Sequence, residues 1–287
     1  MSPLIEAFFD HNTYTFSYVV SDPRSNKCAI IDSVLDYDAA VGRISKNSAN
    51  TVIEFVHANK LEVEWILETH AHADHLSAAT YLKEQLGGRT GIGAEIKMVQ
   101  KVFGEMFNAE PEFHRNGSQF DELFSDNVNF EIGGLTVNVM HTPGHTPACI
   151  TYIFEGAAFV GDTLFMPDYG TARADFPGGD AKALYHSIHR ILNLPPETRL
   201  HMCHDYGTNE RKEFLYLTTV AEQRKNNVQI HEGISVDDFV AFRKQRDAGL
   251  KAPHLLLPSV QFNMRGAELP PAESNGTHYF KIPLKFV

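Results

Sequence analysis

The chain has 287 residues, of which 43% are hydrophobic, and this suits a soluble globular protein with a sizeable core. A formal net charge of −11, with no run rich in Lys or Arg, argues against DNA or RNA as the main partner. No apolar run approaches membrane-spanning length, and residues 1–10 lack the features of a signal peptide. We therefore expect a cytoplasmic protein that acts neither on nucleic acid nor in a membrane.

The first half of the sequence predicts strands with interspersed helices. Strands are expected where aromatic and β-branched residues cluster, and helices where apolar residues recur at helical spacing. We expect strands at 14–20, 27–31 and 65–67, helices at 50–58, 76–86 and 96–107, and polar connections at 33–48 and 108–127.

The second half predicts strands first and then helices. We expect strands at 128–132, 135–140, 150–154, 157–160 and 200–203, helices at 180–194, 210–226 and 236–248, and an extended Pro-rich tail at 252–287. This order indicates an α+β fold with two sheets and helices on the outer faces, a four-layer αββα sandwich. We expect one domain over 1–287, with a C-terminal extension from about residue 230.

The most informative motif is His70-x-His72-x-Asp74-His75, directly after a short apolar strand and before a helix. A strand end projects side chains into open space, and a tight loop can gather several of them around one point. Imidazole and carboxylate ligands suit zinc or iron(II). The motif therefore predicts a metal site.

Three further candidate ligands also follow apolar runs: His145 in a Pro-Gly-His segment, Asp162 after a glycine, and His204. Strand-end placement predicts that all of them converge on one edge of the sandwich. Single histidines are more often structural than ligands, so we leave the others in that class (His141, His186, His189, His201). The three cysteines are far apart and form no CxxC pair, so we expect plain core residues (Cys28, Cys149, Cys203).

These motifs, in this order over residues 70–204, resemble the metallo-β-lactamase superfamily. Within it, the segments 68–79, 170–179, 203–206 and 257–261 are similar to the persulfide dioxygenases, and the nearest likeness is to bacterial persulfide dioxygenases of the glyoxalase II-like type that lack a rhodanese domain. The resemblance implies oxidation of glutathione persulfide by O2 to sulfite and glutathione at one Fe(II) per chain. It also implies a possible homodimer.

In the dioxygenase branch, the resemblance implies iron ligands at His70, His145 and Asp162. Two imidazoles and one carboxylate on one face of an octahedron leave three positions for substrate and dioxygen. The remaining four residues would then support the ligands (His72, Asp74, His75, His204).

The alternative is a glyoxalase II-like dinuclear zinc hydrolase of glutathione thioesters. There the same four residues complete two metal sites, and Asp162 bridges them. The sequence contains all seven residues, so ligand identity does not choose between the two.

Other polar residues are expected to support the site or bind substrate. Asp74 and Asp205 are candidates to hold imidazole N–H groups, and Tyr206 to hydrogen-bond near the metal or the substrate. Arg173 is expected to hold an anionic group or to pair with Asp175. The remaining candidates for the glutathione carboxylates are Arg211, Lys212 and Arg265.

Overall fold

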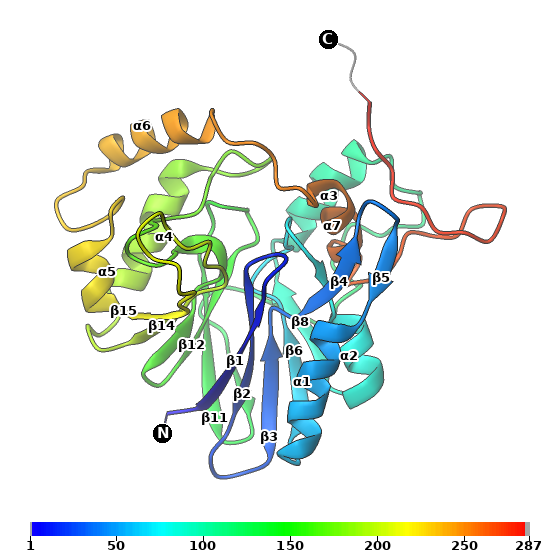
Figure 1. Cartoon of the computed structure of the whole chain (residues 1–287), viewed down its shortest axis with the longest axis horizontal. Coiled ribbons are helices and arrows are strands. Elements are labelled where there is room, and N and C mark those ends of the chain that lie inside the picture. The colour runs from blue at the N-terminus through cyan, green and yellow to red at the C-terminus, as the bar shows by residue number, and fades with distance from the viewer. Residues whose placement is uncertain (1, 285–287) are drawn as a thin grey trace.

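The computed structural model describes residues 2–284, in which two six-stranded sheets pack face to face between outer helices (Figure 1). The first sheet has the order β1 (Leu4–Asp10), β2 (Thr15–Ser21), β3 (Lys27–Ile31), β6 (Glu62–Leu67), β8 (Arg89–Gly93), β9 (Glu122–Phe124). The second has the order β10 (Asn129–Ile132), β11 (Leu135–His141), β12 (Ile150–Phe154), β13 (Ala157–Phe159), β14 (Arg199–His201), β15 (Leu217–Thr219).

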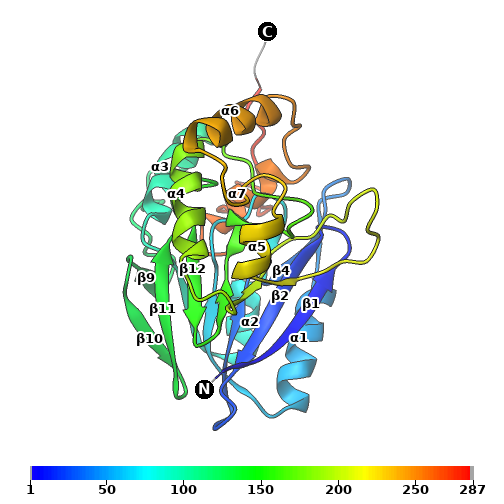
Figure 2. The ribbon, with the colours of Figure 1, turned by 90° about the vertical axis from the view of Figure 1, so that its left-hand side faces the viewer.

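Helices cover the outer face of each sheet. On the first sheet lie α1 (Asn47–Ala58) and α2 (Ala79–Leu86), and on the second α4 (Ala181–Leu192) and α5 (Val220–Asn226), toward which Figure 2 looks. Next to these are α6 (Val236–Asp247), which packs on α4, and the pair α3 (Ile96–Met106) and α7 (Leu256–Asn263). The expected four-layer αββα sandwich is confirmed.

Side chains along each strand point alternately to the two faces of the sheet, and this alternation separates the core between the sheets from the cores under the helices. On β2, Phe16 and Tyr18 point into the core between the sheets, whereas Val19 points to the helices on the other face. On β3, Ile31 and Ile30 divide in the same way. Because side chains alternate along a strand, a strand buried on both faces is apolar almost throughout; β3 has such a run, and in β2 it is interrupted by Ser17, which donates to the backbone oxygen of Asp32.

Four predicted segments are wrong. The polar connection at 108–127 contains β9, which pairs with β8 at the edge of the first sheet. The polar connection at 33–48 contains β4 (Val34–Asp38) and β5 (Arg43–Ser45), which form a small third sheet with β7 (Leu76–Ser77). In 210–226 only the last turns are helical, because β15 joins the edge of the second sheet at 217–219. The tail contains α7, whose apolar residues pack on α3 and β7.

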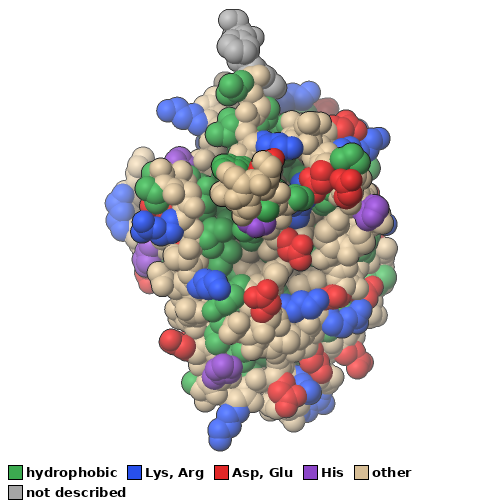
Figure 3. All heavy atoms as spheres, turned by 90° about the vertical axis from the view of Figure 1, so that its right-hand side faces the viewer, with side chains coloured by type: hydrophobic (Ala, Val, Ile, Leu, Met, Phe, Trp, Pro, Cys, Tyr) green, Lys and Arg blue, Asp and Glu red, His purple; other side chains and the backbone are tan. Residues whose placement is uncertain are grey.

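None of the helices within residues 2–284 is both long and apolar enough to cross a lipid bilayer. The face in Figure 3 carries acidic and basic side chains interspersed.

Candidate metal centre

The candidate ligands lie on loops that follow strands at one edge of the sandwich. The His70–His75 loop starts three residues after β6 ends, His145 lies between β11 and β12, and Asp162 and His204 follow β13 and β14. The core holds these strand ends in place, so the loops start from fixed positions.

Two glycines allow the loops to approach their neighbours. Gly144 has φ of +144°, and a Cβ there would lie 2.3 Å from the Cα of Leu184 on α4. Gly161 has φ of +51°, and its Cβ would lie 2.6 Å from Oγ1 of Thr69. Each glycine precedes a candidate ligand, so only glycine lets His145 and Asp162 reach their positions.

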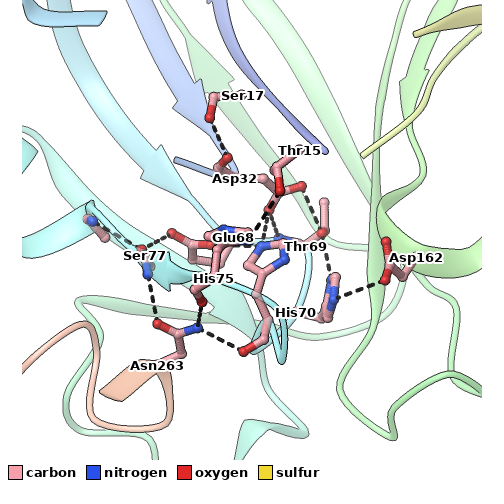
Figure 4. A network of polar contacts seen from close by, with 12 residues as sticks. Thr15, Ser17, Asp32, Glu68, Thr69, His70, His75, Ser77, Asp162 and Asn263 are labelled. Carbon is pink, nitrogen blue, oxygen red and sulfur yellow. Dashed lines mark hydrogen bonds and ion pairs between the residues drawn. The ribbon is translucent and has the colours of Figure 1, made fainter. Parts of the chain in front are cut away.

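His70, His145 and Asp162 form the first cluster. One ligand atom from each lies within 4.8 Å of those from the other two. The Nε2 atoms of His145 and His70 are 3.6 Å and 3.9 Å from Oδ2 of Asp162, and Figure 4 shows the His70 ring turned toward that carboxylate. All three side chains are buried.

Both imidazoles of the first cluster are held through Nδ1. In His145, Nδ1 donates to the backbone oxygen of Arg173 at 2.9 Å. In His70, Nδ1 lies 3.0 Å from Oγ1 of Thr69, which donates to Asp32. These bonds place the lone pair on Nε2, the nitrogen that faces Asp162. Burial lowers the pKa of His70 well below its usual value, which keeps that ring neutral.

His72, Asp74, His75 and His204 form the second cluster, again with ligand atoms within 4.8 Å of one another. Oδ2 of Asp74 lies 3.2 Å from Nδ1 of His75 and 3.5 Å from Nε2 of His204. Nε2 of His204 is also 3.4 Å from Oδ1 of Asp162, so the two clusters adjoin at that carboxylate.

The His72 ring is held by the opposite nitrogen. Its Nε2 lies 3.0 Å from Oδ1 of Asp32 and 3.1 Å from Oε2 of Glu68, and its Nδ1 has no hydrogen-bond partner among residues 2–284. Burial lowers the pKa of His72, but the Asp32 and Glu68 carboxylates outweigh it and raise the pKa well above the usual value. By ligand-atom distance His72 groups with the second cluster and not with the first, although its ring lies 4.1 Å from that of His70 and 4.2 Å from that of His75.

Sequence reasoning missed three residues that shape this loop. Asp32 and Glu68 hold His72, and the Asn263 amide donates to the backbone oxygen of His72. The same amide donates to the backbone oxygen of His75 (Figure 4). Glu68 adjoins the motif, but Asp32 and Asn263 come from distant parts of the chain. The one sequence signal that could have identified these two residues is a polar side chain directly after an apolar run.

The donor set fits a bound metal ion. Four buried ring nitrogens and one carboxylate oxygen have no hydrogen-bond partner among the described residues (His70 Nε2, His72 Nδ1, His75 Nε2, His204 Nε2, Asp162 Oδ1). Buried polar atoms are rarely left unpaired, and five together indicate a missing cation. Nitrogen and carboxylate donors suit zinc or iron(II).

A cavity of about 310 Å³ opens onto the clusters. Asp74, His145 and Asp162 line it. Its aromatic lining is Tyr14, Phe165, Tyr169, Phe176 and Tyr206, and residues after the start of α6 complete it (Arg243, Arg246, Leu250, Lys251, Pro253, His254, Leu255). The first cluster is therefore reachable by a small ligand with an apolar body.

Two of the expected support residues reach the cavity. The Tyr206 ring stacks on His204, with ring centroids 5.7 Å apart. Arg173 also lines the cavity, but its guanidinium makes a bidentate pair with Asp175, at 2.6 and 2.7 Å, and donates to the backbone oxygen of Lys251. Arg173 therefore has its acidic partner within its own loop.

Asp74 lines the cavity as well, whereas four expected support residues do not line it (Asp205, Arg211, Lys212, Arg265). Asp205 holds no imidazole, because its carboxylate accepts from Arg211 and from the backbone N–H groups of Gly207 and Leu215. Arg211 is shared between Asp205 and Asp168, and Lys212 donates only to a backbone oxygen. Arg265 pairs with Glu110 away from the clusters.

Of the histidines expected to be structural, His186 and His189 lie on α4, His141 ends β11, and His201 is in the core. His201 is buried with neither ring nitrogen hydrogen-bonded, and it stacks on Phe159. The three cysteines are buried and form no disulfide. Cys203 nevertheless has its sulfur within 4.8 Å of ligand atoms of Asp162 and His204, which its place on an apolar run did not reveal.

The fold and the donor set thus define a metal-binding αββα sandwich. The family model described as the metallo-beta-lactamase superfamily matches residues 12–204, and the chain belongs to this superfamily.

Similar proteins carry different names. The chain is 55% identical to a "probable metallo-hydrolase" of Burkholderia pseudomallei and 50% identical to "glyoxylase B2" of Dictyostelium discoideum, covering 98% and 99% of this chain and 98% and 97% of those proteins. It is 28% identical to mouse mitochondrial persulfide dioxygenase ETHE1, over 94% of this chain and 91% of that protein. The crystal structure of ETHE1 from Myxococcus xanthus superposes with a TM-score of 0.74, at 24% identity, over 92% of this chain and all of that one.

Proposed function

We propose that the protein is a persulfide dioxygenase that converts glutathione persulfide, O2 and water to glutathione and sulfite, with one Fe(II) held by His70, His145 and Asp162. The observation that carries the proposal is the first cluster: two imidazoles and one carboxylate form a group of three beside the cavity, whereas His72 groups with the second cluster. Two nitrogens and one carboxylate are the donor set of iron(II) oxygenases. The likeness to mouse ETHE1 adds support.

The chain's own residues hold the ligands and shape the space. Bound Fe(II) would supply open coordination positions at which the persulfide sulfur and dioxygen meet. Thr69 and the Arg173 carbonyl fix the rings of His70 and His145 in the orientation that points Nε2 at Asp162. The aromatic walls exclude water from the cavity and hold the apolar part of the substrate.

Recognition of glutathione needs cations for its carboxylates. Arg173 and Arg243 line the cavity but already pair with Asp175 and Asp247. Among residues 2–284, the side chains of Arg246 and Lys251 have no hydrogen-bond or ion-pair partner, and both line the cavity. These two cations are therefore the ones available to bind the substrate carboxylates.

A second candidate function is a dinuclear zinc hydrolase of glutathione thioesters. The second cluster offers four more donors next to Asp162, and two of the similar proteins are named a metallo-hydrolase and a glyoxylase. A metal-bound hydroxide would then attack the thioester carbonyl.

Metal content and two assays test the proposal. Protein purified without added metal should contain about one iron per chain, consume O2 with glutathione persulfide and form sulfite. Two zinc ions per chain, with hydrolysis of S-lactoylglutathione and no O2 uptake after iron is added, would instead establish the hydrolase.

A further inference from the structure

The backbone carbonyl that holds His145 belongs to a loop without regular secondary structure. This oxygen is that of Arg173, and Nδ1 of His145 donates to it. If this loop moves, its carbonyl moves too, and the imidazole that donates to the carbonyl loses its fixed orientation. The contacts that fix residues 171–174 therefore decide how accurately His145 Nε2 faces Asp162.

Those contacts come from α6. Nη1 of Arg243 donates to the backbone oxygen and to Oγ1 of Thr171, both at 3.0 Å. Oδ2 of Asp247 accepts from the backbone N–H of Ala174 at 2.9 Å. The two bonded positions lie on either side of Arg173, so the pair clamps the peptide whose carbonyl holds His145.

The Arg243–Asp247 ion pair is buried, and its burial costs desolvation free energy that helix α6 would not need to spend for its own stability. Arg243 and Asp247 are 1% and 4% exposed, and their side chains lie 2.5 Å apart. Burying an ion pair removes both charges from water and contributes little net stability by itself. Gln229 completes the network, because its Oε1 accepts from Arg243 and from the N–H of Thr171.

We propose that Arg243 and Asp247 are positioning residues for the metal centre, which fix the Thr171–Ala174 segment and thereby aim His145 at the metal. Helix α6 lies beyond residue 204, where the match to the family model ends. This part of the chain thus acts on the centre although it provides no ligand. The inference rests on the proposed ligand role of His145 and on no particular metal or reaction.

Metal affinity of matched variants tests the inference. The double variant Arg243→Met with Asp247→Leu removes the clamp without leaving a buried unpaired charge, and Asp247→Asn removes the charge alone. Each variant is loaded with Co(II), its visible absorption is recorded, and its dissociation constant is measured by competition with a chelator. We expect affinity about tenfold weaker, in the range for lost contacts behind a ligand, and shifted absorption bands.

Two controls separate the outcomes. Ser235→Ala removes the N-terminal cap of α6 without touching residues 171–174, and should leave Co(II) affinity and absorption unchanged. His145→Ala should lose the ion, and if it does not, the ligand assignment itself fails. If His145→Ala loses the ion while the folded Asp247→Asn and double variants bind Co(II) like the parent, the clamp has no positioning role. Equal weakening in Ser235→Ala would also refute the inference, because the effect would then be one of general helix stability.

Discussion

The two histidine clusters use the same residue types but present them differently. In the first, His70 bonds through Nδ1 and leaves Nε2 toward Asp162, whereas two residues later His72 bonds through Nε2 and leaves Nδ1 free. Asp32 takes part in both arrangements, through Thr69 in one and directly in the other. The groups that engage one ring nitrogen therefore decide which nitrogen is left for a ligand, and only His72 leaves Nδ1, since His75 and His204 leave Nε2 as His70 does.

The largest effect should separate the clusters directly. His145→Ala removes a ligand of the first cluster, and we expect loss of iron and a fall in O2 uptake greater than about 100-fold, beyond what loss of a supporting contact causes. His75→Ala alters only the second cluster and should keep about one iron and activity within about tenfold. Metal analysis and oxygen-electrode assays of both proteins check this, and equal loss in the two variants would favour the dinuclear alternative.

Asp32→Ala tests the residue that the clusters share. It leaves His72 with Glu68 alone and removes the acceptor of Thr69, so the metal-free protein should lose about 3 kcal/mol of unfolding free energy. Denaturant unfolding measures this loss. Asp36→Ala is the matched control: that carboxylate accepts two bonds from Ser48 in a half-buried position, and its loss should be about 1 kcal/mol. Similar losses of unfolding free energy in both variants would show that Asp32 stabilises the fold no more than an ordinary half-buried carboxylate does.

His201 extends the comparison between the histidines, because neither of its ring nitrogens has a hydrogen-bond partner among residues 2–284. Burial lowers its pKa to about 3, whereas the unfolded chain takes up this proton below about pH 6.5. The unfolded state then binds more protons between these values, so stability falls as the pH falls through this window. From pH 7 to pH 5 the contribution is about 2 kcal/mol.

His201→Phe keeps a ring against Phe159 and removes this titration. The unfolding free energy of the variant should therefore fall by about 2 kcal/mol less than that of the parent between pH 7 and pH 5. Denaturant unfolding at the two pH values gives the difference, and parallel losses would show that His201 does not titrate in this range.

The smallest effect concerns the cavity rim. Arg246→Ala with Lys251→Ala should raise KM for glutathione persulfide about tenfold and leave kcat unchanged, since the carboxylates are bound equally before and during reaction. Cysteamine persulfide, which has no carboxylate, should react equally with both proteins. Lys244→Ala, on α6 but outside the cavity, should match the parent. An equal rise in KM for both persulfides would argue against carboxylate recognition.

Local sequence signals predicted the layers of the fold and the placement of the seven candidate ligands. Strand ends and the glycines at 144 and 161 are visible in the sequence, and they bring His145 and Asp162 to the loop of His70. The pairing of arginines was not visible, because Arg211 and Arg265 meet carboxylates that the fold brings to them. Long-range contacts of this kind carry no periodic signal.

The errors in helices and strands have the same origin. β4 and β15 form because partner strands lie beside them, and α7 because α3 and β7 cover its apolar side chains. Short segments of this kind take the structure that their neighbours stabilise, so their own composition predicts them poorly.

The floor and the outer wall of the cavity come from different parts of the chain. The candidate ligands on its floor come from strand-end loops at residues 74–162, whereas much of its outer wall comes from residues 243–255, which follow the part of the chain that matches the family model. Evolution can therefore exchange the outer wall and admit a different substrate while every ligand stays in place. Similar chains with names as different as metallo-hydrolase, glyoxylase and persulfide dioxygenase are what such an arrangement would produce.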